Sequence, residues 1–256
     1  PCAIFCPQNE MHPVGAPSMR SDRINPRMTQ EAPRGSAAEN SLPLPRRDRA
    51  RALLRRLQRM TALVLVLLIA GMLRFYNINW DEGLHLHPDE RYVAFLATLI
   101  QPVWTAEEYF DSGKSALNPF NTDWGSRYVY GTLPLFGPRY VAEFLDNGCG
   151  PAPNRVIRRL NMAVFGDELS TCPKGTMVGF DRINLVGRAW SAVMDLLSIA
   201  TLYLIAKRLF NWRVGILAAS LSALAVLQIQ QAHFFTVDAT ANLFVNLCLL
   251  FCVNMV

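Results

Sequence analysis

The fold class of this chain is decided by residues 57–76, which read LQRMTALVLVLLIAGMLRFY. A helix needs about 20 predominantly apolar residues to cross the hydrocarbon core of a bilayer, and this run has that length. Its basic flank is long and it contains no small-residue cleavage site, so we interpret it as a membrane anchor rather than a cleaved signal peptide. Further apolar runs occupy residues 183–206, 214–231 and 239–256. The sequence therefore predicts an all-α, polytopic membrane protein.

The composition and the two ends of the chain indicate its domain organisation. Apolar residues make up 51% of the 256 residues, more than in a typical soluble domain. Residues 1–45 instead contain repeated prolines and little periodic apolar sequence, which predicts a disordered N-terminal segment. Residues 46–256 then form the N-terminal part of a transmembrane domain. Because the chain starts at Pro1 and stops within an apolar run, we expect it to be a piece of a larger protein.

The distribution of positive charge predicts how the chain is oriented in the membrane. The arginines that precede the first apolar run are Arg46, Arg47, Arg49, Arg51, Arg55, Arg56 and Arg59. Such a cluster could bind nucleic acid, but beside an apolar helix it fits the positive-inside rule better, so no nucleic-acid partner is expected. Residues 207–213 (KRLFNWR) fall on the same side when the spans are counted from a cytoplasmic N-terminus. The long segment 77–182 and the short link 232–238 are then predicted to face outward.

The outward segment 77–182 is too long for a simple connector. Residues 102–109 and 138–145 show helical spacing of apolar side chains, which predicts interfacial helices lying on the membrane surface. Cys149 and Cys172 both fall in this segment, where a disulfide is permitted if the compartment is oxidising. Two unpaired thiols are equally compatible with the sequence, because spacing alone does not give their separation.

Two carboxylates, Asp89 and Glu90, begin the outward segment soon after the first span. An enzyme that moves a sugar from a lipid phosphate to a hydroxyl or amine needs a carboxylate to accept the proton of the acceptor. It also needs cations or a metal ion to hold the leaving phosphate. Arg91 and Tyr92 are candidates for contact with phosphate or sugar. The alternative is an ordinary helix start, in which Pro88 opens the helix and the acids follow at its positive end.

Histidines and polar residues near these acids suggest further contacts. His85 and His87 alternate with Leu86 and could present ligands to a divalent metal ion, although hydrogen-bonding loop histidines are the default interpretation of the pattern. His233 and Asp238 bracket an aromatic stretch at the outward end of two spans, where a polar cluster could bind sugar hydroxyls. The alternative for Asp238 is the N-cap of the last span.

Asp195 lies within the second span, where a carboxylate needs a partner. We expect it to be structural, through an interhelical hydrogen bond or pairing with a cation that the sequence does not identify.

The order of several short segments is more specific than any one of them. They are residues 73–76 (LRFY), 87–92 (HPDERY), 118–135, 187–192 (GRAWSA) and 230–238 (QQAHFFTVD). Across about residues 57–256 this set resembles the dolichyl-phosphate-mannose-protein mannosyltransferase and aminoarabinose transferase group. More specifically, it looks like the bacterial phospholipid carrier-dependent glycosyltransferases. Two departures stand out: Asp195 replaces an expected small residue, and the family has many more helices.

The resemblance implies a C-type glycosyltransferase fold that moves a sugar from a polyprenyl-phosphate carrier to a protein, lipid or glycan acceptor. It implies that Asp89 activates the acceptor with Glu90 beside it, and that Arg74, Arg91 and Arg188 contact phosphate. The expected location is a bacterial plasma membrane, with the N-terminus cytoplasmic and the active site extracytoplasmic. We expect the piece to be inactive alone. The alternative function is a non-enzymatic polytopic membrane protein, such as a carrier or scaffold.

Overall fold

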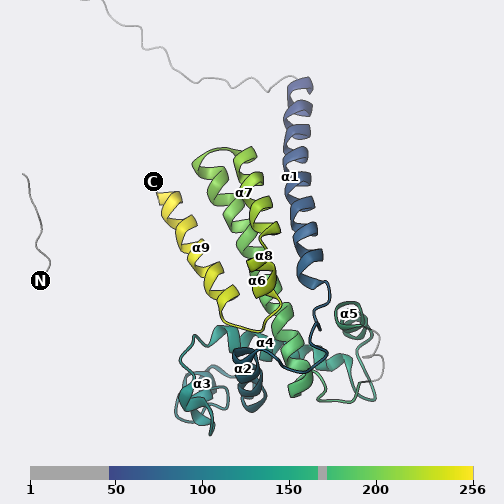
Figure 1. The fold of residues 1–256 in the computed structure, drawn as a ribbon, viewed down its shortest axis with the longest axis vertical. Helices are drawn as coiled ribbons and strands as arrows, with labels where there is room; N and C mark the ends of the chain where they lie inside the picture. Colours follow the sequence, from purple (N-terminus) through teal and green to yellow (C-terminus); the bar gives the residue numbers. More distant parts are fainter. Residues whose placement is uncertain (1–45, 167–171, 256) are drawn as a thin grey trace, which may run out of the picture. The chain divides into compact units, whose positions relative to one another are not determined.

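The computed structural model describes residues 46–166 and 172–255, which belong to one compact unit (Figure 1). The predicted disordered segment 1–45 lies outside the described residues. The described part contains helices and no strand, which confirms the all-α prediction. The α-helices are α1 (Arg46–Phe75), α2 (Pro88–Leu99), α3 (Ala106–Phe110), α4 (Leu133–Leu145), α5 (Arg155–Phe165), α6 (Phe180–Leu209), α7 (Trp212–Leu224), α8 (Val226–Ala232) and α9 (Asp238–Met255).

Within the described residues, three helices are long and apolar enough to cross a membrane: Leu53–Phe75 of α1, all of α6, and all of α9. The central helix is α6, which packs against α1, α7 and α9 (Figure 1). Much of the outer surface of α1 and α9 consists of exposed large apolar side chains, which water would solvate poorly but lipid accommodates. These features indicate an integral membrane protein.

The predicted third span, residues 214–231, is not one straight helix. It is divided into α7 and α8, which meet at an angle of 61°. The break falls at Ala225, whose backbone is extended. There the carbonyl oxygens of Ser222 and Ala223 at the end of α7 accept hydrogen bonds from the guanidinium of Arg74, at 3.4 and 3.0 Å. Because this arginine from α1 satisfies carbonyl groups that a continuing helix would use, the break leaves them paired inside the protein.

Contacts at the two ends of the spans agree with the predicted alternation of sides. At one end, the Arg59 guanidinium of α1 lies 5.4 Å from the centre of the Trp212 ring at the start of α7, so the two basic segments share that end. At the other end, Nε2 of His233 lies 3.0 Å from the Tyr76 carbonyl oxygen that follows α1. The link 232–238 and the segment after α1 therefore share the opposite end.

The loop between α1 and α6 folds into α2 to α5, short 3-10 turns and a buried apolar core that also includes α6 residues. The predicted helix at 138–145 lies within α4. The predicted helix at 102–109 is wrong in extent, since only α3 is helical. Residues before α3 are held in an extended path, because Gln101 N–H donates to Ala116 and Tyr140 O–H donates to Val103. The sequence did not predict α5.

The two loop cysteines are bonded to each other. Cys149 and Cys172 form a disulfide with their Cα atoms 5.0 Å apart, which decides between the two alternatives that the sequence left open. Beside it, the buried Asp146 carboxylate accepts backbone hydrogen bonds from Gly175 at 2.9 Å and Met177 at 3.2 Å. The disulfide and this carboxylate together tie the end of α4 to the segment that leads into α6.

We expect the double variant Cys149→Ser/Cys172→Ser to unfold about 3 kcal/mol more easily, because the disulfide closes a loop of 23 residues and constrains the unfolded chain. Thermal unfolding in detergent, with and without reductant, measures this effect. The matched control is Cys248→Ser/Cys252→Ser, which alters two free, exposed cysteines of α9. A wild-type protein whose unfolding is unchanged by reductant would contradict the prediction.

Candidate functional site

The two segments that carry the acidic signatures touch one another. The backbone N–H of Phe235 donates to Oε1 of Glu90 at 3.1 Å. The rings of His87 and Phe234 stack with their centres 4.4 Å apart, and Trp80 packs edge-on against Phe234. Residues separated by about 145 positions in the chain are therefore brought to one place at the end of the spans.

The N-terminus of α2 forms as its sequence predicts. His87 is the N-cap, and its Nδ1 accepts a hydrogen bond from the Glu90 N–H at 3.3 Å, while Pro88 occupies the first helical position. Asp89 follows at the positive end of the helix. Its side chain is exposed and makes no hydrogen bond or ion pair with any residue in the described part of the chain. Asp89 is thus an available carboxylate on a fixed helix end.

Glu90, the adjacent residue, is fully buried and paired with Arg188 of α6. Arg188 donates to Glu90 through Nε at 2.6 Å and Nη2 at 2.8 Å, which is a bidentate pair. The same guanidinium donates to Asp81 through Nη1 at 2.9 Å and Nη2 at 2.8 Å, and to the Ile78 carbonyl at 3.0 Å. All five N–H groups of Arg188 are used in this way. The Trp80 ring covers the guanidinium at 5.4 Å.

This cluster changes two roles expected from the sequence. Because the Arg188 guanidinium is buried and saturated by protein oxygens, it offers no donor to a phosphate. Because both Glu90 oxygens accept from Arg188, Glu90 is not a free catalytic base. We therefore assign both residues a positioning role: they fix the start of α2 against α6 and so hold Asp89 in place.

Asp81 belongs to this cluster but was not singled out by the sequence. Burial alone would raise the pKa of its carboxyl group, but the hydrogen bonds and positive charge of Arg188 outweigh burial and hold the pKa below its ordinary value. The available signal was Arg188 itself, since an arginine inside an apolar span needs carboxylate partners. Glu90 alone accepts from two of the five N–H groups and would leave three of them without a carboxylate.

Arg74 is likewise committed to a structural pair. Its Nε donates to Oδ2 of Asp195 at 2.5 Å, and both side chains are buried between α1 and α6. This contact is an interhelical hydrogen bond and ion pair, as expected for a structural Asp195, and it identifies Arg74 as the partner. It also replaces the phosphate contact expected for Arg74, because the guanidinium is buried and three of its four other N–H groups donate to the carbonyl oxygens of Ala70, Ser222 and Ala223.

The remaining candidate side chains divide into structural and accessible groups. His233 is structural, since its ring lies between the carbonyl oxygens of Ile229 and Tyr76. Arg91 is exposed on α2, and Asp238 is exposed at the first position of α9. Tyr92 is half-buried and donates to the Trp124 carbonyl at 3.3 Å, and burial raises the pKa of its phenol. Asp89, Arg91 and Asp238 are therefore the accessible charged residues among those predicted.

The two histidines expected to bind a metal ion do not converge. His85 is buried and stacks on Phe180 with ring centres 4.2 Å apart, whereas His87 caps α2 and stacks on Phe234. His85 Nε2 lies 3.8 Å from Asp181, beyond hydrogen-bond distance. Among the residues that the structure describes, no group of three or more histidine, cysteine or acidic side chains could hold a metal ion. These histidines therefore do not fit a shared metal site.

A glycine permits the close packing of the link 232–238 on α6. A Cβ atom at Gly187 would overlap the buried ring of Phe235. We expect Gly187→Ala to destabilise the protein by about 1–3 kcal/mol, because Phe235 must move and its N–H bond to Glu90 moves with it. Thermal unfolding measures the loss, and Gly131→Ala, where a Cβ meets open space, is the matched control. Equal unfolding temperatures for the two variants would contradict this account.

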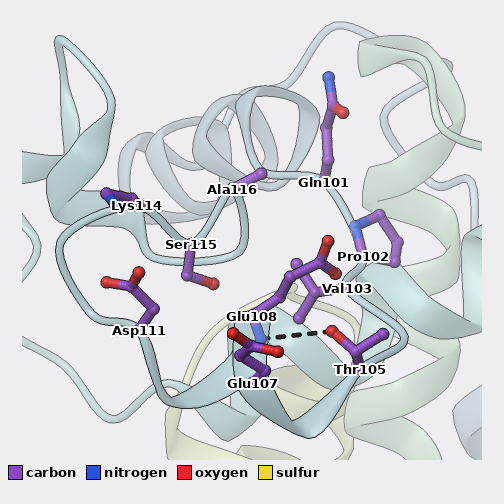
Figure 2. Close-up of a pocket in the computed structure, with 10 residues that line it drawn as sticks. All are labelled: Gln101, Pro102, Val103, Thr105, Glu107, Glu108, Asp111, Lys114, Ser115 and Ala116. Atoms are coloured by element: carbon purple, nitrogen blue, oxygen red, sulfur yellow. Dashed lines mark hydrogen bonds between the residues drawn. The ribbon is translucent and has the colours of Figure 1, made fainter.

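A separate polar cavity of about 670 Å³ lies at the other end of α2, around α3 (Figure 2). Its lining includes the carboxylates of Glu107, Glu108 and Asp111, and also Lys114 and the buried Ser115. Asp89 and the start of this lining are separated by the 12-residue helix α2, a length of about 18 Å. The cavity is thus distinct from the surface around Asp89.

Comparison with known proteins finds a family match for the C-terminal part of this chain. Residues 177–256, which include α6 to α9, match the family of dolichyl-phosphate-mannose-protein mannosyltransferases. Over these residues the match supports the resemblance noted in the sequence, and it supports a membrane glycosyltransferase. The matched residues include Arg188 and also Phe235, whose N–H donates to Glu90, but they do not include Asp89. No curated protein sequence and no solved structure matches the chain significantly.

Proposed function

We propose that this protein transfers a sugar from a polyprenyl-phosphate carrier to a hydroxyl or amine of a protein, lipid or glycan acceptor, on the extracytoplasmic face of the membrane. The observation that carries the proposal is the exposed Asp89 carboxylate on a helix end that Glu90 and Arg188 anchor to a membrane span. The family match of residues 177–256 supports the reaction class.

In this proposal Asp89 is the general base. The acceptor oxygen or nitrogen attacks C1 of the sugar from the face opposite the phosphate, so the bond from C1 to the acceptor forms as the bond from C1 to the phosphate oxygen breaks. The acceptor proton passes to Asp89, and the lipid phosphate leaves with the bonding electron pair. Arg91, exposed two residues further along α2, is our candidate for stabilising the phosphate charge.

Two features support the extracytoplasmic placement of the loop. The Cys149–Cys172 disulfide is typical of an oxidising compartment. The basic segments at the start of α1 and between α6 and α7 lie at the opposite end, as expected for the cytoplasmic side. Labelling by a membrane-impermeant maleimide tests the placement: Ser126→Cys in the loop should react from outside, and Arg208→Cys should not. The reverse pattern would exclude an extracytoplasmic active site.

The reaction itself is tested with the protein expressed from its complete reading frame and reconstituted in vesicles. Transfer of labelled sugar is measured from a polyprenyl-phosphate donor and, in parallel, from a nucleotide-sugar donor. We expect transfer from the lipid donor alone. Transfer from the nucleotide sugar would overturn the donor assignment. Absence of transfer from any donor, by folded protein and with acceptors of all three classes, would favour the carrier or scaffold alternative.

A further inference from the structure

Helix α5 is amphipathic and leaves an apolar face uncovered. Ile157 and Asn161 face the protein and are buried, and Asn161 donates to the Leu145 carbonyl at 3.0 Å. Val156 and Leu160, four residues apart on one face, are 75% and 47% exposed. Such exposure is costly in water for a short helix, but it is usual for a helix that lies in a membrane interface.

The same face continues into an apolar groove of about 370 Å³. The groove is bounded by Phe75 at the end of α1, by Val141 and Leu145 of α4, by Leu160 and Val164 of α5, and by Val186 to Met194 of α6. It opens outward, because the lining residues Val141, Leu160 and Val193 are among the exposed apolar side chains. Because α1 and α6, which form two of its walls, are candidate membrane spans, we expect the groove to open toward lipid.

Positive charge borders this apolar face. α5 carries Arg155, Arg158 and Arg159 within its first five residues, and none of their guanidinium groups forms a hydrogen bond or ion pair in the described part of the chain. Arg155 and Arg159 are exposed. At 100° per residue, Arg159 lies beside the stripe formed by Val156 and Leu160, so its aliphatic stem can run along the apolar face while the guanidinium reaches the headgroup layer.

We propose that α5 and this groove form a binding site for an anionic glycerophospholipid. One acyl chain would occupy the groove, and the lipid phosphate and its anionic headgroup would contact Arg155 and Arg159. Charge complementarity selects the occupant, because the exposed guanidinium groups of Arg155 and Arg159, which have no carboxylate partner among the described residues, lie on the helix whose Leu160 and Val164 line the apolar groove. The site does not depend on the proposed glycosyl transfer, since its residues lie outside the cluster around Asp89.

Native mass spectrometry of the delipidated full chain tests the proposal with dioleoyl phosphatidylglycerol and dioleoyl phosphatidylcholine as probes. We expect phosphatidylglycerol to bind about tenfold more tightly than phosphatidylcholine, and Arg155→Gln/Arg159→Gln to remove this preference. Val193→Trp, which fills the groove from α6 without altering α5, should weaken both lipids. The matched control Lys114→Gln/Arg127→Gln removes two exposed loop cations and should leave the preference unchanged. Thermal unfolding verifies that each variant is folded.

Equal binding of the two lipids by the wild type would overturn the proposal. So would an unchanged preference in Arg155→Gln/Arg159→Gln, or undiminished binding in Val193→Trp. Displacement of phosphatidylglycerol by an equimolar polyprenyl phosphate would also overturn it, because the groove would then belong to the sugar donor.

Discussion

Replacing Arg188 with methionine should lower the free energy of unfolding by about 3–5 kcal/mol, the cost typical of removing one partner of a buried ion pair. In this protein the cost falls on two carboxylates, since Asp81 and Glu90 both lose their counter-charge while their side chains remain fully buried. The Ile78 carbonyl loses a donor as well. Unfolding in a graded mixture of detergent and denaturant measures the change.

Three further variants separate the charge cluster from general damage to α6. Arg208→Met removes an exposed arginine of the same helix and should be nearly neutral. Arg188→Lys keeps the positive charge but loses the planar guanidinium that bonds both carboxylates. Its free energy of unfolding should therefore lie between those of the wild type and Arg188→Met. Adding Asp81→Asn and Glu90→Gln to Arg188→Met should recover part of the loss, because no unpaired charge is left buried. An Arg188→Met protein as stable as Arg208→Met would refute the role of the cluster.

The sequence was sufficient for features that depend on local pattern. The apolar lengths of α1, α6 and α9 identified these spans, and Pro88 followed by two acids identified the start of α2. The two basic segments predicted which ends of the helices share a side, and Arg59 against Trp212 agrees with that prediction. Each of these features is determined by residues close together in the sequence and by whether they lie in lipid or in water.

Features that depend on contacts between distant residues could not be predicted. The break at Ala225 has no neighbouring proline or glycine that would predict it from the sequence. It depends instead on Arg74 of another helix, which donates to the carbonyl groups at the end of α7. Asp89 and Glu90 are adjacent and similar in chemistry, yet one is exposed and the other is buried. Their difference arises from Arg188, about 98 residues away in the chain. Only the folded structure shows that the carboxylate of Glu90 is paired and that of Asp89 is exposed.

That difference leads to the largest expected effect on activity. We expect Asp89→Asn to reduce sugar transfer by about 10²–10⁴-fold, because the amide cannot accept the acceptor proton. Its stability should match the wild type, since the carboxylate makes no contact in the described part of the chain. Glu90→Gln should lower stability and activity together, because the neutral side chain weakens the pair that anchors α2.

Transfer rates and thermal unfolding, measured on the same reconstituted preparations, distinguish a catalytic residue from a positioning residue. Asp123→Asn, which changes another exposed loop aspartate, is the matched control and should leave both quantities unchanged. Asp89→Glu retains a base on a longer side chain and should restore part of the rate with an altered pH profile. A stable Asp89→Asn protein with a near-normal rate would show that the proton passes to another group. A selective loss of rate in Glu90→Gln, with unfolding unchanged, would reverse the roles that we propose for the two acids.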